Sequence, residues 1–162
     1  MRTALVLAAA LLAPLYAQQR DVFKLDLTIR DTADAAAKGG RRFSLLVFGQ
    51  DKGTLRIGNR VPVPSGSPGL GGPQSYTYVD VGVNLDCTLQ EVGGKVGMRA
   101  DLDISTAIGS EKAPGAAPTI SQVKVNISTA VVAGKPTVVA SFDDPVTSRK
   151  FEVEALVTKM NQ

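Results

Sequence analysis

Residues 76–106, "YTYVDVGVNLDCTLQEVGGKVGMRADLDIST", contain the clearest structural signal in the chain. Apolar and polar residues alternate along it, pause at Gly93-Gly94, and alternate again, which is typical of half-buried strands. If the two glycines form a two-residue turn, Val92 faces Lys95 and the two runs pair as an antiparallel hairpin. The apolar partners then share one face: Leu89 with Met98, Cys87 with Ala100, Leu85 with Leu102, and Val83 with Ile104. A slip by one residue would separate them, so the register is well specified.

Shorter runs of the same period lie on both sides of this hairpin, and no long segment after the first twenty residues has a helical period. The runs are residues 23–29, "RFSLLVFG" (42–49), 55–57, 123–127 and 151–157. Turn-forming sequences separate them: "GQDKGT" (49–54), "VAGKPT" (132–137) and "DDPVTS" (143–148). Amphipathic strands of this kind bury their apolar faces by packing two sheets together. We therefore predict an all-β fold, an antiparallel β-sandwich of about eight strands.

Some segments have other readings. "DTADAAAKGG" (31–40) fits either one helical turn or a loop. "VPVPSGSPGLGGPQS" (61–75) and "GSEKAPGAAPT" (109–119) are rich in Gly, Pro and Ser and predict long loops. Alternation would also suit a transmembrane barrel. The chain has no Trp, three Tyr and five Phe, too few for aromatic girdles, so the sandwich is the favoured interpretation. Charges in the first and last runs, among them Lys24, Asp26, Arg30, Arg149, Lys150, Glu152, Glu154 and Lys159, predict exposed edge strands.

The first residues, "MRTALVLAAALLAPLYAQQR", have the features of a secretory signal peptide. Arg2 supplies the positive charge, residues 5–15 are apolar, and Ala17 is a small residue at the expected cleavage site. An uncleaved N-terminal anchor is the alternative. We expect residues 1–17 to be removed and residues 18–162 to form a single β-domain in the periplasm or outside the cell.

Composition limits the chemistry. The chain has no His, so Ser-His and Cys-His catalytic arrangements and His-based metal sites are excluded. The one cysteine, Cys87, cannot form an intrachain disulfide, and the alternation places it in the core. A formal charge of +3 is too small to indicate nucleic acid. We therefore expect no enzyme, no cofactor, no membrane insertion, and a protein partner or self-association.

The polar face of the hairpin holds the one constellation of possible chemical interest. In the predicted register Asp86 faces Asp101, and Asn84 faces Asp103. Facing carboxylates repel each other, so something must offset them. A solvated face with Arg99 or Lys124 nearby is one answer. A hard cation such as calcium bound by Asp86, Asp101 and Asp103 is the other, although a flat strand face seldom supplies enough oxygens.

The order of these segments resembles the core domain of bacterial secretins, the outer-membrane pore proteins of type II and III secretion and type IV pili. The resemblance covers about residues 55–145. It begins with "LRIGNRVPVPSG", a Gly-containing segment before Val-Pro, and continues with a "Y.DVG..L" strand and a hairpin ending near a Ser. The matching positions are Gly58, Val61, Pro62, Tyr78, Asp80, Val81, Gly82, Leu85, Ser105, Pro118, Gly134, Pro136 and residues 137–140. The resemblance implies a secretin-core-like topology and, as one possible role, an oligomeric envelope component.

The chain also resembles a group of small exported bacterial proteins of uncharacterised activity. The shared features are the "LTIRDT" opening, the "YTYVDVGVN" strand, and an ending of Gly134-Lys135-Pro136, Asp144-Pro145, Arg149 and Glu152-Val153. No activity follows from this likeness. The register itself places Gly82 opposite Ser105. A glycine there either allows another backbone or subunit to approach, or marks a simple bulge or twist.

Overall fold

The computed structural model describes residues 21–32, 40–65, 75–108, 118–144 and 149–160. Every regular element in these ranges is a strand. The strands are β1 (Val22–Asp31), β2 (Arg41–Phe48), β3 (Lys52–Pro64), β4 (Tyr76–Val92), β5 (Lys95–Ile108), β6 (Thr119–Val131), β7 (Thr137–Asp143) and β8 (Lys150–Met160). The predicted all-β fold of about eight strands is confirmed. No helix among the described residues is long and apolar enough to cross a membrane.

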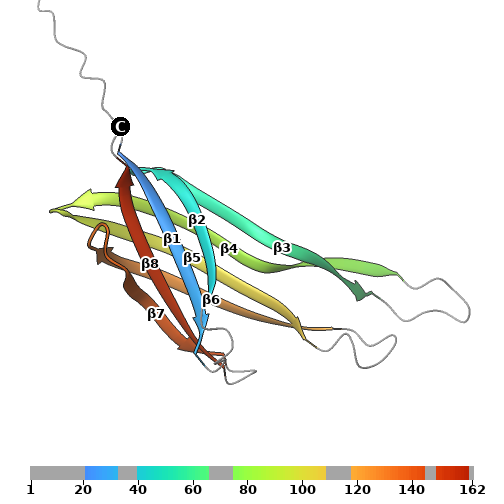
Figure 1. Ribbon diagram of the computed structural model, residues 1–162. Helices are drawn as coiled ribbons and strands as arrows, with labels where there is room; N and C mark the ends of the chain where they lie inside the picture. Colours follow the sequence, from blue (N-terminus) through green and yellow to red (C-terminus); the bar gives the residue numbers. More distant parts are fainter. Residues whose placement is uncertain (1–20, 33–39, 66–74, 109–117, 145–148, 161–162) are drawn as a thin grey trace, which may run out of the picture.

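The strands form two antiparallel four-stranded sheets that pack face to face (Figure 1). Sheet A has the order β2-β1-β8-β7, and sheet B has the order β3-β4-β5-β6. Their facing sides supply one apolar core, in which Phe23, Leu85, Leu89 and Val153 are completely buried. This is the sandwich that the alternation predicted.

The hairpin of β4 and β5 has the predicted register. Val92 pairs with Lys95, Leu85 with Leu102, and Val83 with Ile104. Gly93 and Gly94 both have positive φ, which a two-residue turn of this kind requires. Cys87 is buried between the sheets, and burial raises the pKa of its thiol to about 11, so the thiol is protonated at neutral pH.

Sheet B is the longer sheet, and the end formed by β3 and β4 extends past sheet A (Figure 1). The predicted loop 61–75 is wrong at its start, because Val61–Pro64 continue β3 and pair with Tyr76–Val79 of β4. Backbone pairing to a neighbouring strand holds this segment extended even though it contains two prolines; Pro is tolerated there because β3 is an edge strand. The predicted loop 109–119 is also too long at its end, because Thr119 begins β6. The rest of both predicted loops, residues 66–74 and 109–117, lies outside the described residues. Residues 33–39, for which the sequence fitted a helical turn or a loop, lie outside them too.

The predicted edge position of the terminal strands is also wrong. β1 and β8 pair with each other at the centre of sheet A, and β2 and β7 are the edges. Apart from Asp31 and Lys159 at the strand ends, the charges of β1 and β8 lie on the outer face of the sheet, where opposite charges meet across the strands. The Arg30 guanidinium bonds Glu154 at 3.0 Å and Glu152 at 3.4 Å. An alternating charged strand is therefore compatible with a central strand when one face of the sheet is solvated.

One end of the sandwich is fastened by polar contacts between the sheets. Lys159 of β8 lies 2.6 Å from Glu91 of β4 and 3.1 Å from Asp21, and these carboxylates raise the pKa of Lys159. The backbone N–H of Gln50 donates to the Leu89 carbonyl at 2.8 Å. At the other end β3 and β4 continue past sheet A, and Tyr76 and Tyr78 are exposed there.

Candidate functional site

Two glycines face each other across β3 and β4 in sheet B. Gly58 of β3 and Gly82 of β4 are directly opposite, and Gly82 has φ +150°, a conformation that side chains disfavour. A Cβ on Gly82 would lie 2.1 Å from the Ile57 carbonyl oxygen, and one on Gly58 would lie 2.2 Å from that of Val81. The backbones of β3 and β4 therefore approach closely here because both residues lack side chains. Of the two interpretations of Gly82, close approach by another backbone is the one that the structure has, and this backbone is β3 of the same chain.

Ser105 of β5 occupies the space beside Gly82, as the register predicted. Its hydroxyl accepts a hydrogen bond from the Gly82 N–H at 3.0 Å and lies 3.5 Å from the Gly82 carbonyl. Ser105 is 8% exposed, so this contact satisfies a backbone donor in a nearly buried place. Three strands are thus joined at one row, and the Gly82–Ser105 pair of the secretin-like motif has a structural role there.

The other motif residues are spread along sheet B and its connections. Tyr78 is 64% exposed opposite Pro62, Asp80 pairs with Arg60 at 3.0 Å, and Val81 is half-buried. Pro118 precedes β6, Pro136 precedes β7, and Gly134 lies in the turn between these strands with φ +76°. The Gly134 N–H donates to the Val157 carbonyl at 2.7 Å. These residues fix strand ends and turns, and they do not converge on one site.

The predicted carboxylate row is present, but each carboxylate has its own partners. Asp86 contacts Lys52 at 2.9 Å, Arg56 at 2.8 Å and Thr54 at 3.0 Å. The hydrogen bond from Lys52, with those from Thr54 and Arg56, lowers the pKa of Asp86 to about 2. Three donors from β3 therefore offset the repulsion expected between Asp86 and Asp101.

The two other carboxylates are held by β6. The Asn126 amide donates to Asp101 at 2.8 Å, and the Gln122 amide donates to Asp103 at 2.7 Å. Lys124 lies 3.6 Å from Asp103, as the solvated-face interpretation expected, whereas the Arg99 side chain, which that interpretation also named, pairs with none of the described carboxylates. Within the described ranges no three Asp, Glu, Cys or His side chains are grouped to hold a metal ion. The geometry therefore gives the cation site no support.

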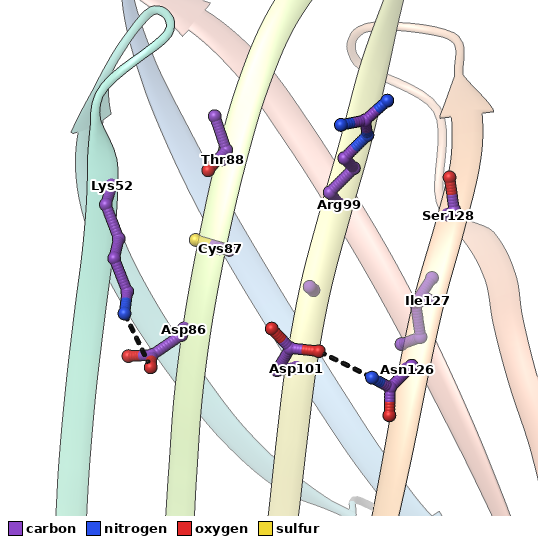
Figure 2. A pocket seen from close by; sticks show the side chains of 10 residues that line it. Lys52, Asp86, Cys87, Thr88, Arg99, Asp101, Asn126, Ile127 and Ser128 are labelled. Carbon is purple, nitrogen blue, oxygen red and sulfur yellow. Dashed lines mark hydrogen bonds and ion pairs between the residues drawn. The ribbon is translucent and has the colours of Figure 1, made fainter.

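These side chains line a shallow groove on the outer face of sheet B (Figure 2). The groove has a volume of about 540 Å³ and is lined mainly by Lys52, Asp86, Thr88, Arg99, Asp101, Asn126 and Ser128. A second hollow of about 330 Å³ adjoins it around Asp103 and Lys124. Sequence reasoning missed Lys52 and Arg56 as partners of Asp86, because the register of β3 cannot be derived without a short turn between β3 and β4. The structure therefore defines a β-sandwich in which the longer sheet carries a polar groove on its outer face.

Comparisons with known proteins identify where this architecture recurs. No protein-family model matches the sequence, and a search of curated proteins gives no significant match. Solved secretin structures do match. The enterotoxigenic E. coli (ETEC) pilotin–secretin AspS–GspD complex matches with a TM-score of 0.55 and 16% identity over 75% of this chain and 28% of the other. The Klebsiella pneumoniae type II secretion system outer membrane complex, which contains PulD, matches with a TM-score of 0.55 and 14% identity. This match covers 88% of this chain and 38% of the other.

The Salmonella SPI-1 type III injectisome secretin InvG matches with a TM-score of 0.55 and 10% identity over 88% of this chain and 62% of the other. The predicted resemblance to the secretin core is thereby confirmed at the level of the fold. The chain corresponds to between 28% and 62% of the length of these secretin chains.

Proposed function

We propose that the chain is an exported, non-enzymatic β-domain of the bacterial cell envelope that binds another protein, with the open edge of β6 as its main docking element. The secretin-like fold supports an envelope role. The observation that carries the binding role is β6 itself. It is a 13-residue edge strand of sheet B, and Lys124 is its one charged residue.

The opposite edge of sheet B differs in character. β3 is also 13 residues long, but it carries Lys52, Arg56 and Arg60, and Pro62 and Pro64 remove two backbone donors near its end. Charges and prolines are the usual means by which edge strands avoid pairing with other chains. β6 has no proline and few such guards, so it is the edge of sheet B better suited to accept an additional strand.

A second candidate is an oligomeric secretin-like component of the outer membrane or of a secretion system. The equal lengths of β3 and β6 favour it, because β3 of one copy could pair with β6 of the next and close a ring without open edges. In that arrangement the docking partner of β6 is another copy of the chain.

Size-exclusion chromatography with light scattering separates the two candidates. The mature protein, residues 18–162, is run with and without detergent at several concentrations. We expect a monomer or small oligomer that needs no detergent. A large ring that forms only in detergent would favour the oligomeric candidate and overturn the first.

A further inference from the structure

The groove on sheet B contains one cross-strand row in which every side chain can donate a hydrogen bond and none is negatively charged. Lys52 pairs with Thr88, Thr88 with Arg99, and Arg99 with Ser128, so the four residues lie side by side on β3 to β6. Their neighbours along the strands, Cys87, Ala100 and Ile127, face the core and are buried. The four polar side chains therefore point to the outer face, across neighbouring strands spaced about 4.8 Å apart.

Within this row Arg99 has no counter-ion. Lys52 is engaged by Asp86 of the next row, at 2.9 Å. No hydrogen bond or ion pair joins the side chain of Arg99 to another residue in the parts of the chain that the structure describes. In Figure 2 its guanidinium extends away from Asp101, between Thr88 on β4 and Ser128 on β6. An oxyanion above Arg99 would meet a forked donor with a hydroxyl group on each side.

Asp101, two residues further along β5, is the complementary group. It accepts a hydrogen bond from Asn126 at 2.8 Å, and no Lys or Arg among the described residues pairs with it. Arg99 and Asp101 thus form an unpaired cation and an unpaired anion on one face of one strand, about 6.8 Å apart along it. An extended peptide with an acid and a base two residues apart presents opposite charges at the same spacing.

We infer that this groove binds an extended segment of a partner protein that carries an acidic and a basic side chain two positions apart, the acid on Arg99 and the base on Asp101. The inference rests on the proposed binding role. Among the described residues that line the groove there is no aromatic ring to stack against a sugar, which favours a peptide over a polysaccharide. Thr88 and Ser128 add hydroxyl donors beside the bound carboxylate.

The test is an NMR titration of the ¹⁵N-labelled mature protein with synthetic peptides. The first peptide is acetyl-Thr-Glu-Thr-Lys-Thr-amide. The second, acetyl-Thr-Glu-Lys-Thr-Thr-amide, has the same composition but places the two charges on opposite faces of an extended chain. We expect saturable shifts of the Arg99 side-chain Nε and of the Thr88 and Ser128 amides with the first peptide, with a dissociation constant on the order of 1 mM. We expect no saturation with the second.

Variants show whether the two charges carry the binding. Arg99→Gln and Asp101→Asn should each weaken binding at least about tenfold, because each removes one charge-assisted contact. Lys135→Gln, which makes the same charge change as Arg99→Gln in the turn before β7, should leave binding unchanged. Equal binding of both peptides, binding that survives Arg99→Gln, or self-association through this face would overturn the inference. Docking at the β6 edge is measured on residues other than Arg99 and Asp101. One of the two proposals can therefore be contradicted while the other stands.

Discussion

Replacing Gly82 by alanine should disrupt the close approach of β3 and β4 at Gly58 and Gly82. The added methyl group would lie 2.1 Å from the Ile57 carbonyl oxygen and 2.5 Å from the Gly58 Cα, so β3 and β4 would have to separate by about 1 Å. Alanine at φ +150° adds backbone strain of about 1–3 kcal/mol, and overpacking adds about 1–3 kcal/mol. The free energy of unfolding should therefore fall by about 2–6 kcal/mol, which lowers Tm by roughly 5–20 °C.

Gly97→Ala is the matched control, because it makes the same change in the same sheet. The nearest backbone atom to its added Cβ, the Gln90 carbonyl oxygen, is 3.5 Å away, an ordinary contact, and Gly97 does not have positive φ. We expect Gly97→Ala to leave the free energy of unfolding unchanged or to raise it by up to about 1 kcal/mol. Urea unfolding followed by circular dichroism measures both variants. Equal losses, or an unchanged Gly82→Ala, would refute the close approach described for Gly58 and Gly82.

Three further predictions use other parts of the chain. Leu85→Ala should lower the free energy of unfolding by about 2–5 kcal/mol, because Leu85 is fully buried. Leu46 is 64% exposed, so Leu46→Ala should change it by less than about 0.5 kcal/mol. Equal losses of the two variants in urea unfolding would show that the buried and exposed faces are misassigned. The pKa of Asp86 is lowered to about 2, so its stabilising contacts with Lys52 should be intact above about pH 4 and be lost as the pH falls through about 2. An NMR titration of the Asp86 carboxyl group with a midpoint near its ordinary 3.8 would contradict this. Intact mass of the protein from the producing cell should show a mature N-terminus at or near Gln18, and recovery of the full-length chain from the cytosol would contradict export.

The sequence was most informative where a short turn joined two long alternating runs. Gly93-Gly94 fixes the register of β4 and β5, and this register correctly placed Leu85 in the core and Ser105 beside Gly82. The order of strands within sheet A could not be read in the same way. β1 and β8 lie at opposite ends of the sequence, and their charged faces suit a solvated central strand as well as an edge.

The candidate site was predicted only in part. The carboxylates of Asp86 and Asp101 were placed correctly on one face. The ion-pair partners of Asp86 come from β3, however, and no short turn in the sequence fixes the register of β3 against β4. The same lack of a register hid Gly58 as the partner of Gly82. The unpaired state of Arg99 depends on where every neighbouring side chain lies, and periodicity carries no information on that.

Native-state hydrogen exchange along β6 tests the central claim most directly. If β6 is an open edge, only the amides that bond β5 are protected, so protection should alternate along Thr119–Val131 in the isolated mature protein. The amides of β5, which has strands on both sides, should be protected throughout. Protection along β6 as complete as that of β5 would show that another strand already covers this edge, and would contradict the proposal that it is free to bind a partner.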